Sequence, residues 1–215
     1  MSGRAPGRSL SAIVLASNNR GKLLELSQIL AAFRVTLFPL SHFSSESPEE
    51  SGSSFRENAL IKARFAAQAS QLPAIADDSG LEVDVLNGAP GVYSARYAGL
   101  KASDKDNNEK LLTALSGVPE VQRTARFRCV LAYVDDADDS QPIIAEGLWD
   151  GRILATARGA EGFGYDPLFE PLGEIRSAAE LSIEEKNCVS HRAQALRLLA
   201  DRLFATDRAA NTVTK

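Results

Sequence analysis

The sequence predicts an α/β domain built on a mixed β-sheet with flanking helices. Strand-like and helix-like segments alternate along most of the chain, which is the pattern of helices packed on a sheet. Two strand signals near residues 74–77 and 81–85 are separated by only a turn, so not every strand has a helical crossover. With 215 residues and 44% hydrophobic composition, the chain can bury a core without disulfides or structural metals.

The first predicted elements are a strand at residues 12–16, a helix from about residue 23 to residue 32, and a strand at residues 35–38. The inward face of this helix consists of Leu23, Leu26, Leu30 and Phe33. The Ser- and Glu-rich stretch at residues 41–54 has the composition of a surface loop.

The second predicted helix begins with a capping-box signal, Ser54 followed by Glu57, and continues to about residue 70. Its Asn58 and Lys62 share one face because they are four positions apart. The strand after this helix is expected to end in the turn DDSG, and a further strand follows in which apolar and acidic residues alternate.

Beyond the loop GAPGVYSARYAG, a helix is expected near residues 106–115. A strong strand signal follows at residues 125–133, where apolar residues alternate with arginines, and we expect it to pair with residues 143–148. A closing helix follows the segment EEKNCVSHR, and its predicted inward face consists of Ala193, Leu196, Leu199, Ala200 and Leu203.

These elements predict a single domain at residues 11–206, with a flexible extension at residues 1–10 and a polar tail at residues 207–215. No apolar run is long enough for a signal core or a membrane span. The formal net charge of −4 and a pI near 5.3 do not favour nucleic-acid binding. The two cysteines lack metal-ligand spacing, which fits a reducing cytoplasm.

The segment SNNRGK joins a predicted strand to a helix, where backbone N–H groups can hold phosphate oxygens. A Walker loop needs a glycine five positions before Gly21 and a Ser or Thr after Lys22. This chain has Ala16 and Leu23 there, which excludes a Walker ATPase. A solvated turn capped by Asn19 stays open beside anion binding.

In DDSG, Asp77 and Asp78 could hold a divalent cation through carboxylate oxygens, or they could belong to an ordinary turn. The phosphatases of the HAD class need a second Asp two residues after the first, and Ser79 stands there instead. In GFGYDP, a base could stack on Phe163, or Phe163 and Tyr165 could be core aromatics.

Lys186, His191 and Arg192 are potential hydrogen-bond donors near the start of the closing helix, which Ser190 is expected to cap. Cations are disfavoured at a helix N-terminus. An anionic or carbonyl-bearing ligand would compensate for them, although a solvated surface face is the alternative.

The segments SNNRGK, SFRENALIKA, ADDSGL, GVYSARY, GFGYDP and EEKNCVSHR occur in the order seen in one family. From about residue 13 to residue 204, the chain closely resembles the inosine triphosphate pyrophosphatases, also called XTP/dITP diphosphatases. The resemblance implies an elongated mixed α/β fold with two lobes around a central nucleotide-binding cleft, and a homodimer. It also implies magnesium-dependent hydrolysis of ITP, dITP or XTP to the monophosphate and pyrophosphate.

Residue by residue, the resemblance implies that Asp78 is the catalytic acidic residue, a metal ligand and the base toward water. Glu49 resembles the second metal-associated carboxylate, with Glu50 as a competing choice. Asp77 would assist these ligands indirectly, and Ser79 would touch the nucleotide.

The resemblance also assigns residues to the substrate. The triphosphate would be held by Ser17, Asn18, Asn19, Arg20, Gly21, Lys22 and Lys62. The base, sugar and α-phosphate would meet Phe163, Gly164, Tyr165, Asp166, Lys186, His191 and Arg192. The lysines and Mg²⁺ would together offset the roughly four negative charges of the ligand.

Two other functions stay open. One is a Maf-like pyrophosphatase that acts on other modified nucleotides, against which SHR and GFGYDP argue. The other is a nonenzymatic nucleotide-binding module, which would not need Glu49, Asp77 and Asp78.

Overall fold

The computed structural model describes residues 11–17, 21, 23, 24, 26, 27 and 35–211, with the backbone alone for 205–211. The predicted N-terminal extension and most of the predicted helix after SNNRGK lie outside these residues. None of the described helices is long and apolar enough to cross a membrane.

The centre of the fold is one six-stranded sheet with the order β2-β1-β3-β4-β5-β6. Its strands are β1 (Ala12–Leu15), β2 (Thr36–Pro39), β3 (Ala74–Val83), β4 (Thr124–Val134), β5 (Ile143–Ile153) and β6 (Phe169–Pro171). Strand β1 pairs in parallel with β2 and β3, and all the other pairs are antiparallel. The prediction of a mixed sheet is therefore confirmed.

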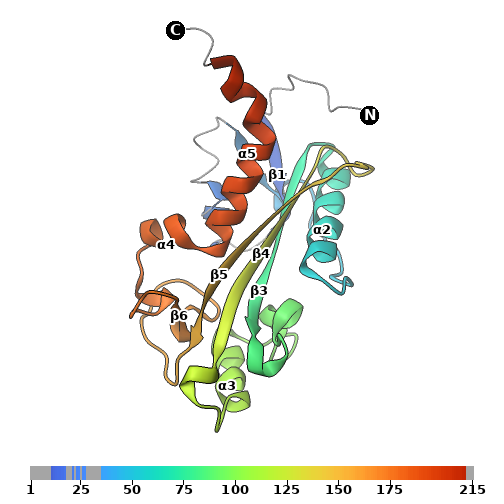
Figure 1. Cartoon of the computed structure of the whole chain (residues 1–215). Helices are drawn as coiled ribbons and strands as arrows, with labels where there is room; N and C mark the ends of the chain where they lie inside the picture. The colour runs from blue at the N-terminus through green and yellow to red at the C-terminus, as the bar shows by residue number, and fades with distance from the viewer. Residues whose placement is uncertain (1–10, 18–20, 22, 25, 28–34, 212–215) are drawn as a thin grey trace.

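Helices flank this sheet, and the molecule is elongated along β3, β4 and β5 (Figure 1). The helices are α2 (Phe55–Ser70), α3 (Asp104–Ala114), α4 (Ile183–Val189) and α5 (His191–Asn211). Near one end, α2 and α5 lie on opposite faces of the sheet, and each buries its own apolar cluster there. A third cluster, around Leu81, Phe127 and Phe169, fills the end that carries α3.

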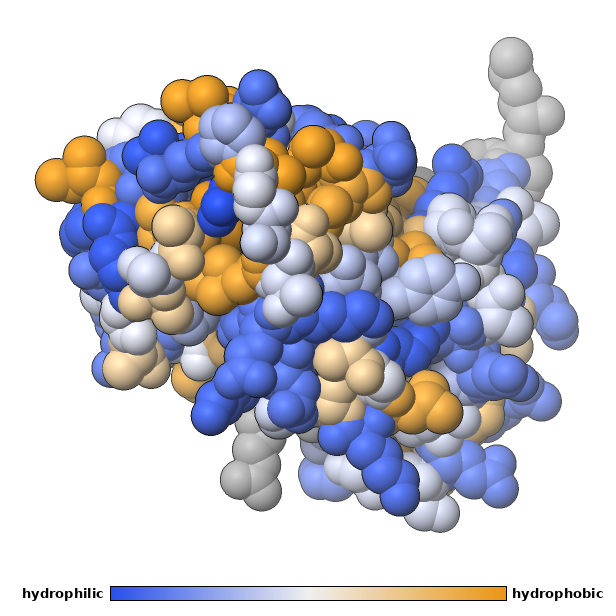
Figure 2. Space-filling model, turned by 90° about the horizontal axis from the view of Figure 1, so that it is seen from below, coloured by the Kyte–Doolittle hydropathy of each residue, from blue (hydrophilic) through white to orange (hydrophobic). Residues whose placement is uncertain are grey.

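Figure 2 views the molecule from the α3 end, where apolar residues gather over one part of the surface with hydrophilic residues among and around them. The division of the fold into two lobes stays a prediction.

The predicted turn at DDSG is wrong, because β3 runs through it without interruption and pairs with β4 along its whole length. Gly80 has a packing role here. A Cβ at this position would lie 2.5 Å from both the Gly91 carbonyl oxygen and Ser94 Oγ. The residue is glycine because another backbone approaches closely, not because the chain turns. Val85, predicted in the second strand, lies in a 3-10 helix instead.

The helix caps largely follow the prediction. Ser54 Oγ accepts from the Glu57 N–H at 3.2 Å, as in a capping box. The Glu57 carboxylate, however, accepts from Ser53 N and Ser53 Oγ, one residue earlier. Ser190 Oγ accepts from the Ala193 N–H at 3.3 Å, which confirms the predicted cap of α5. The α5 backbone stays helical to Asn211, into the segment predicted as a polar tail.

Candidate functional site

A pocket of about 400 Å³ opens beside β3. Among the described residues, β1 pairs with β3 only at Ala74 and Ile75, so β1 does not cover the rest of this strand edge. The pocket collects residues from the end of β1, the loop before α2, the 162–166 loop, α4 and the start of α5. The predicted site residues that line it are Ser17, Lys62, Ser79, Phe163, Gly164, Tyr165, Asp166, Lys186, His191 and Arg192.

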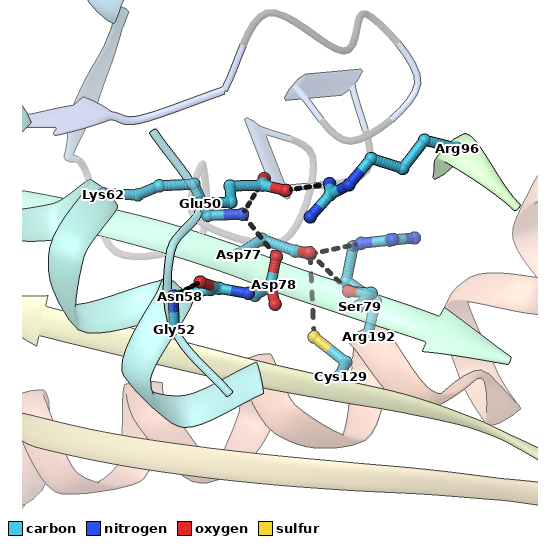
Figure 3. Close-up of polar contacts among 10 residues, drawn as sticks. All are labelled: Glu50, Gly52, Asn58, Lys62, Asp77, Asp78, Ser79, Arg96, Cys129 and Arg192. Atoms are coloured by element: carbon cyan, nitrogen blue, oxygen red, sulfur yellow. Dashed lines mark hydrogen bonds and ion pairs between the residues drawn. The ribbon is translucent and has the colours of Figure 1, made fainter. Parts of the chain in front are cut away.

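Lys62 is the centre of a charged cluster on the α2 face of the sheet (Figure 3). Its Nζ lies 2.5 Å from Asp78 Oδ1 and 3.2 Å from Glu50 Oε1. Arg96 Nη1 lies 2.6 Å from the other oxygen of the Glu50 carboxylate, Oε2. Four side chains from the loop before α2, from α2 itself, from β3 and from the 3-10 helix Gly91–Arg96 therefore meet at one point.

The charges in this cluster shift each other's pKa. Burial lowers the pKa of Lys62, but the charge and hydrogen bond of Asp78, together with the charges of Glu50 and Asp77, outweigh it, so this pKa lies above its usual value. Burial raises the pKa of Glu50, yet Lys62 and Arg96 together hold it below its usual value. Both groups are therefore charged near neutral pH.

Between the two candidate glutamates, the structure brings Glu50 to this cluster. Glu49 is exposed on the loop, whereas Glu50 lines the pocket and accepts from two cations. The assignment of Glu49 as the second carboxylate therefore lacks a structural partner among the described residues, and Glu50 has two. A loop has no side-chain periodicity, so no local pattern distinguishes Glu49 from Glu50.

Asp77 belongs to a different network, on the α5 face of the sheet. Its Oδ2 accepts from Arg192 Nε at 2.7 Å and lies 3.6 Å from the Cys129 thiol, while Ser79 Oγ donates to its Oδ1. The exposed fractions of the Arg192 and Asp77 side chains are 4% and 0%, so this is a fully buried ion pair. Asp77 therefore orients Arg192, and Ser79 is occupied with Asp77.

His191 is fixed by ring stacking. Its ring lies parallel to Phe127 at a centroid distance of 4.9 Å and near Trp149 at 6.3 Å. The start of α5 approaches β5 so closely that a Cβ on Gly147 would lie 2.0 Å from the His191 carbonyl oxygen. A glycine in β5 thus allows α5 to place His191 and Arg192 at the pocket.

Phe163 and Lys186 lie at the other end of the pocket. Asp166 Oδ2 accepts from Lys186 Nζ at 2.7 Å and from the Phe163 N–H at 2.9 Å. Lys186 Nζ and Arg192 Cζ each lie 5.6 Å from the centre of the Phe163 ring. Asp166 therefore holds the loop and Lys186 together, and the ring has two cations beside it.

Tyr165 is a core residue that also borders the pocket. It is buried, and its hydroxyl donates to the Ser94 carbonyl oxygen at 2.8 Å. Burial raises the pKa of Tyr165 well above its usual value, so the phenol stays neutral. The alternative interpretation as a core aromatic is confirmed for Tyr165.

Helix α3 also holds the 162–166 loop of the pocket in place, which the sequence did not indicate. The Gly164 N–H donates to Asp104 Oδ2 at 2.7 Å, and Asn108 Nδ2 donates to the Gly164 carbonyl oxygen at 2.9 Å. These contacts join segments far apart in the sequence. Arg96 was likewise missed, although it lies within the quoted motif GVYSARY.

The predicted phosphate loop is described only in part. Asn18, Asn19, Arg20 and Lys22 lie outside the described residues. Ser17 lines the pocket directly after β1, and its N–H donates to the Leu15 carbonyl oxygen at 2.9 Å.

The carboxylates of this cluster suit a hard divalent cation whose remaining ligands come from phosphate and water. Asp78 and Glu50 converge on one positive charge, the Lys62 ammonium, at 2.5 and 3.2 Å. Within the described ranges, no group of three or more His, Cys, Asp or Glu side chains could form a complete metal cage. Magnesium sites with one or two carboxylates commonly complete their shell with substrate phosphates and water.

The fold and the site together define a class: α/β proteins with a pocket at the open edge of a mixed sheet, charged at one end and aromatic at the other. The model of the Ham1 family matches residues 13–202, and the chain belongs to this family.

Its relatives are similar over nearly their whole length. The dITP/XTP pyrophosphatase of Thioalkalivibrio sulfidiphilus is 58% identical over 191 residues, which cover 89% of this chain and 97% of that protein. The solved HAM1 protein of Coxiella burnetii has a TM-score of 0.85 and 47% identity, covering 91% of this chain and 99% of the other. The Staphylococcus aureus Ham1 structure has a TM-score of 0.81 and 40% identity, with the same coverage.

Proposed function

We propose that this protein hydrolyses non-standard purine nucleoside triphosphates, such as dITP, XTP and ITP, to the monophosphate and pyrophosphate. One observation carries the proposal: a single pocket is lined by the Lys62–Glu50 ion pair, which Asp78 joins, and by an aromatic ring flanked by Lys186 and Arg192. These two ends match the two ends of a nucleotide. The name of a 58% identical relative, dITP/XTP pyrophosphatase, supports the same substrates.

At the charged end, Asp78 is the proposed catalytic residue. As a carboxylate it can accept a proton from the water that attacks the α-phosphorus. Lys62 can stabilise the negative charge of the phosphates. Asp78 and Glu50 would hold Mg²⁺, which when bound neutralises phosphate charge. Pyrophosphate then leaves without a covalent enzyme intermediate.

At the aromatic end, the base would stack against Phe163, and Lys186, His191 and Arg192 would supply hydrogen bonds. Asp166 and Asp77 fix two of these cations through the contacts at 2.7 Å described above. A purine with a C6 carbonyl offers an acceptor to such donors, whereas adenine offers an amino group. Protein donors that face the C6 carbonyl of the base would therefore favour ITP over ATP.

The test is a product analysis across nucleoside triphosphates with Mg²⁺, including adenine, guanine and pyrimidine nucleotides as well as 7-methylguanine nucleotides. IMP together with pyrophosphate from ITP is the expected result. IDP with orthophosphate would overturn the proposed bond cleavage. Turnover confined to modified pyrimidine or 7-methylguanine nucleotides would indicate a Maf-like activity.

A homodimer and a cytoplasmic location, both implied by the family resemblance, are part of the proposal. Light scattering of the purified protein tests the first, and a monomer mass at micromolar concentration would contradict it. Cell fractionation tests the second. The net charge of −4 supports the absence of nucleic-acid binding.

A further inference from the structure

Lys62 occupies the place where the two proposed metal ligands meet. Its Nζ lies 2.5 Å from Asp78 Oδ1 and 3.2 Å from Glu50 Oε1 (Figure 3). The exposed fractions of the Lys62 and Asp78 side chains are 13% and 9%, so the contact is largely shielded from water. The two carboxylates therefore already share one cation, and that cation belongs to the protein.

A divalent ion held by Asp78 Oδ1 and Glu50 Oε1, the two oxygens that face Lys62, would compete with this ammonium for the same position. Mg²⁺ binds oxygen at about 2.0–2.1 Å, which puts the ion in the space that Nζ fills. The ion and the ammonium also carry charge of the same sign, and they would repel each other strongly in a shielded site. Binding is thus an exchange of one cation for another.

We propose that Lys62 is a placeholder cation, which holds Asp78 and Glu50 in position and is displaced by the divalent ion. The displaced ammonium then points into the pocket, where Lys62 is part of the lining and can meet a phosphate. This inference rests on the proposed function, because it uses the same metal ligands.

Arg96 keeps the site assembled during the exchange. Its Nη1 lies 2.6 Å from Glu50 Oε2, the oxygen that does not face Lys62. The loop carrying Glu50 is also tied to α2, because the Gly52 N–H donates to Asn58 Oδ1 at 2.8 Å. Glu50 therefore stays in position when the Lys62 ammonium leaves, because Arg96 binds its carboxylate and the Gly52–Asn58 hydrogen bond holds its loop.

The first test is Mn²⁺ binding without nucleotide, measured by calorimetry or electron paramagnetic resonance. Lys62→Met removes the competing charge and keeps the length of the side chain, so its Kd is expected to fall on the order of tenfold. Lys105→Met is the matched control, because the Lys105 side chain is 83% exposed and its ion pair with Glu109 is long, at 3.8 Å. An unchanged or higher Kd in Lys62→Met overturns the proposal.

The second test uses the parent protein, so it does not depend on the folding of a variant. Acetylation of lysines by acetic anhydride, followed by mass spectrometry, reports the access to each ammonium. Adding Mg²⁺ should increase the acetylation rate of Lys62 several-fold and leave that of Lys105 unchanged. Equal rates for Lys62 with and without Mg²⁺ would overturn the exchange.

Asp78→Asn separates this inference from the proposed function. If Asp78→Asn loses Mn²⁺ binding while Lys62→Met keeps the parental Kd, the metal site stands and the placeholder role alone is wrong. If Asp78→Asn binds Mn²⁺ as the parent does, the proposed metal site fails, and the placeholder role fails with it.

Discussion

Asp77 and Asp78 are consecutive residues of β3, and their carboxylates lie on opposite faces of the sheet. Asp77 pairs with Arg192 of α5, and Asp78 pairs with Lys62 of α2. This follows from the alternation of side chains along a strand. One carboxylate therefore serves the aromatic end of the pocket and the other serves the charged end, so the two aspartates should respond differently to the same substitution.

Asp78→Asn should lower kcat for ITP by about 10² or more, because the amide cannot accept the proton of the attacking water. Its shape is nearly unchanged, so nucleotide affinity should change much less. Steady-state kinetics combined with equilibrium binding of a non-hydrolysable ITP analogue separates the two effects. Parental turnover by Asp78→Asn would rule out this residue as the base.

Asp77→Asn should act mainly on stability. It leaves the buried guanidinium of Arg192 without its ion-pair partner, and breaking a buried pair costs about 3–5 kcal/mol. Asp150→Asn is the control, since its pair with Arg126 is largely exposed and should contribute less than about 1 kcal/mol. Urea unfolding measures both. Similar losses of unfolding free energy in Asp77→Asn and Asp150→Asn would contradict a buried ion pair at Asp77.

The opposite orientation of these two aspartates could not be predicted from the local sequence pattern, for a physical reason. DDSG has the composition of a turn, yet its glycine is required by the close approach of Gly91 and Ser94, which belong to another segment. The long alternating strand that became β4 was predicted well because its pattern is local. Contacts such as Gly164 with Asp104 join distant segments, and no local pattern reveals them.

Gly147→Ala should destabilise the protein and disturb the start of α5. Its Cβ would lie 2.0 Å from the His191 carbonyl oxygen, and such overpacking costs about 1–3 kcal/mol. Gly117→Ala is the control, because its φ of +78° brings backbone strain of about 1–2 kcal/mol without any neighbour within 4 Å. Only Gly147→Ala should also raise KM for ITP. An unchanged KM would show that α5 keeps its position.

The cluster around Lys62 should make stability depend on pH at both ends of the range. The pKa of Glu50 is lowered from 4.5 in the folded state. The contribution of this carboxylate to the free energy of unfolding is therefore present above pH 4.5 and is lost as pH falls through the lowered pKa. The pKa of Lys62 is raised from 10.5, so its contribution is full below pH 10.5 and is lost as pH rises through the raised pKa.

Unfolding free energies of parent and Glu50→Gln, measured from pH 2 to pH 7, test the acidic limb. The gap between the two proteins should be greatest near neutral pH and should close in acid. A gap that stays constant down to pH 2 would mean that the Glu50 charge contributes nothing. Glu49→Gln is the control and should show no comparable gap, since Glu49 is exposed.

The last prediction concerns selectivity for the base. Arg192 is a donor-only side chain beside Phe163, held by Asp77, and its partner His191 is fixed by stacking. Facing these donors, the amino group of adenine would leave hydrogen-bonding groups unpaired, at about 1–3 kcal/mol each. Arg192→Ala should therefore lower the ITP to ATP ratio of kcat/KM on the order of tenfold, mainly through loss of ITP turnover.

Because Ala also leaves the buried charge of Asp77 without its partner, the double variant Asp77→Asn/Arg192→Ala is the matched control. If the ratio is low in both variants, the guanidinium reads the base. If the double variant recovers the parental ratio, the stranded carboxylate caused the loss and Arg192 has no part in base recognition.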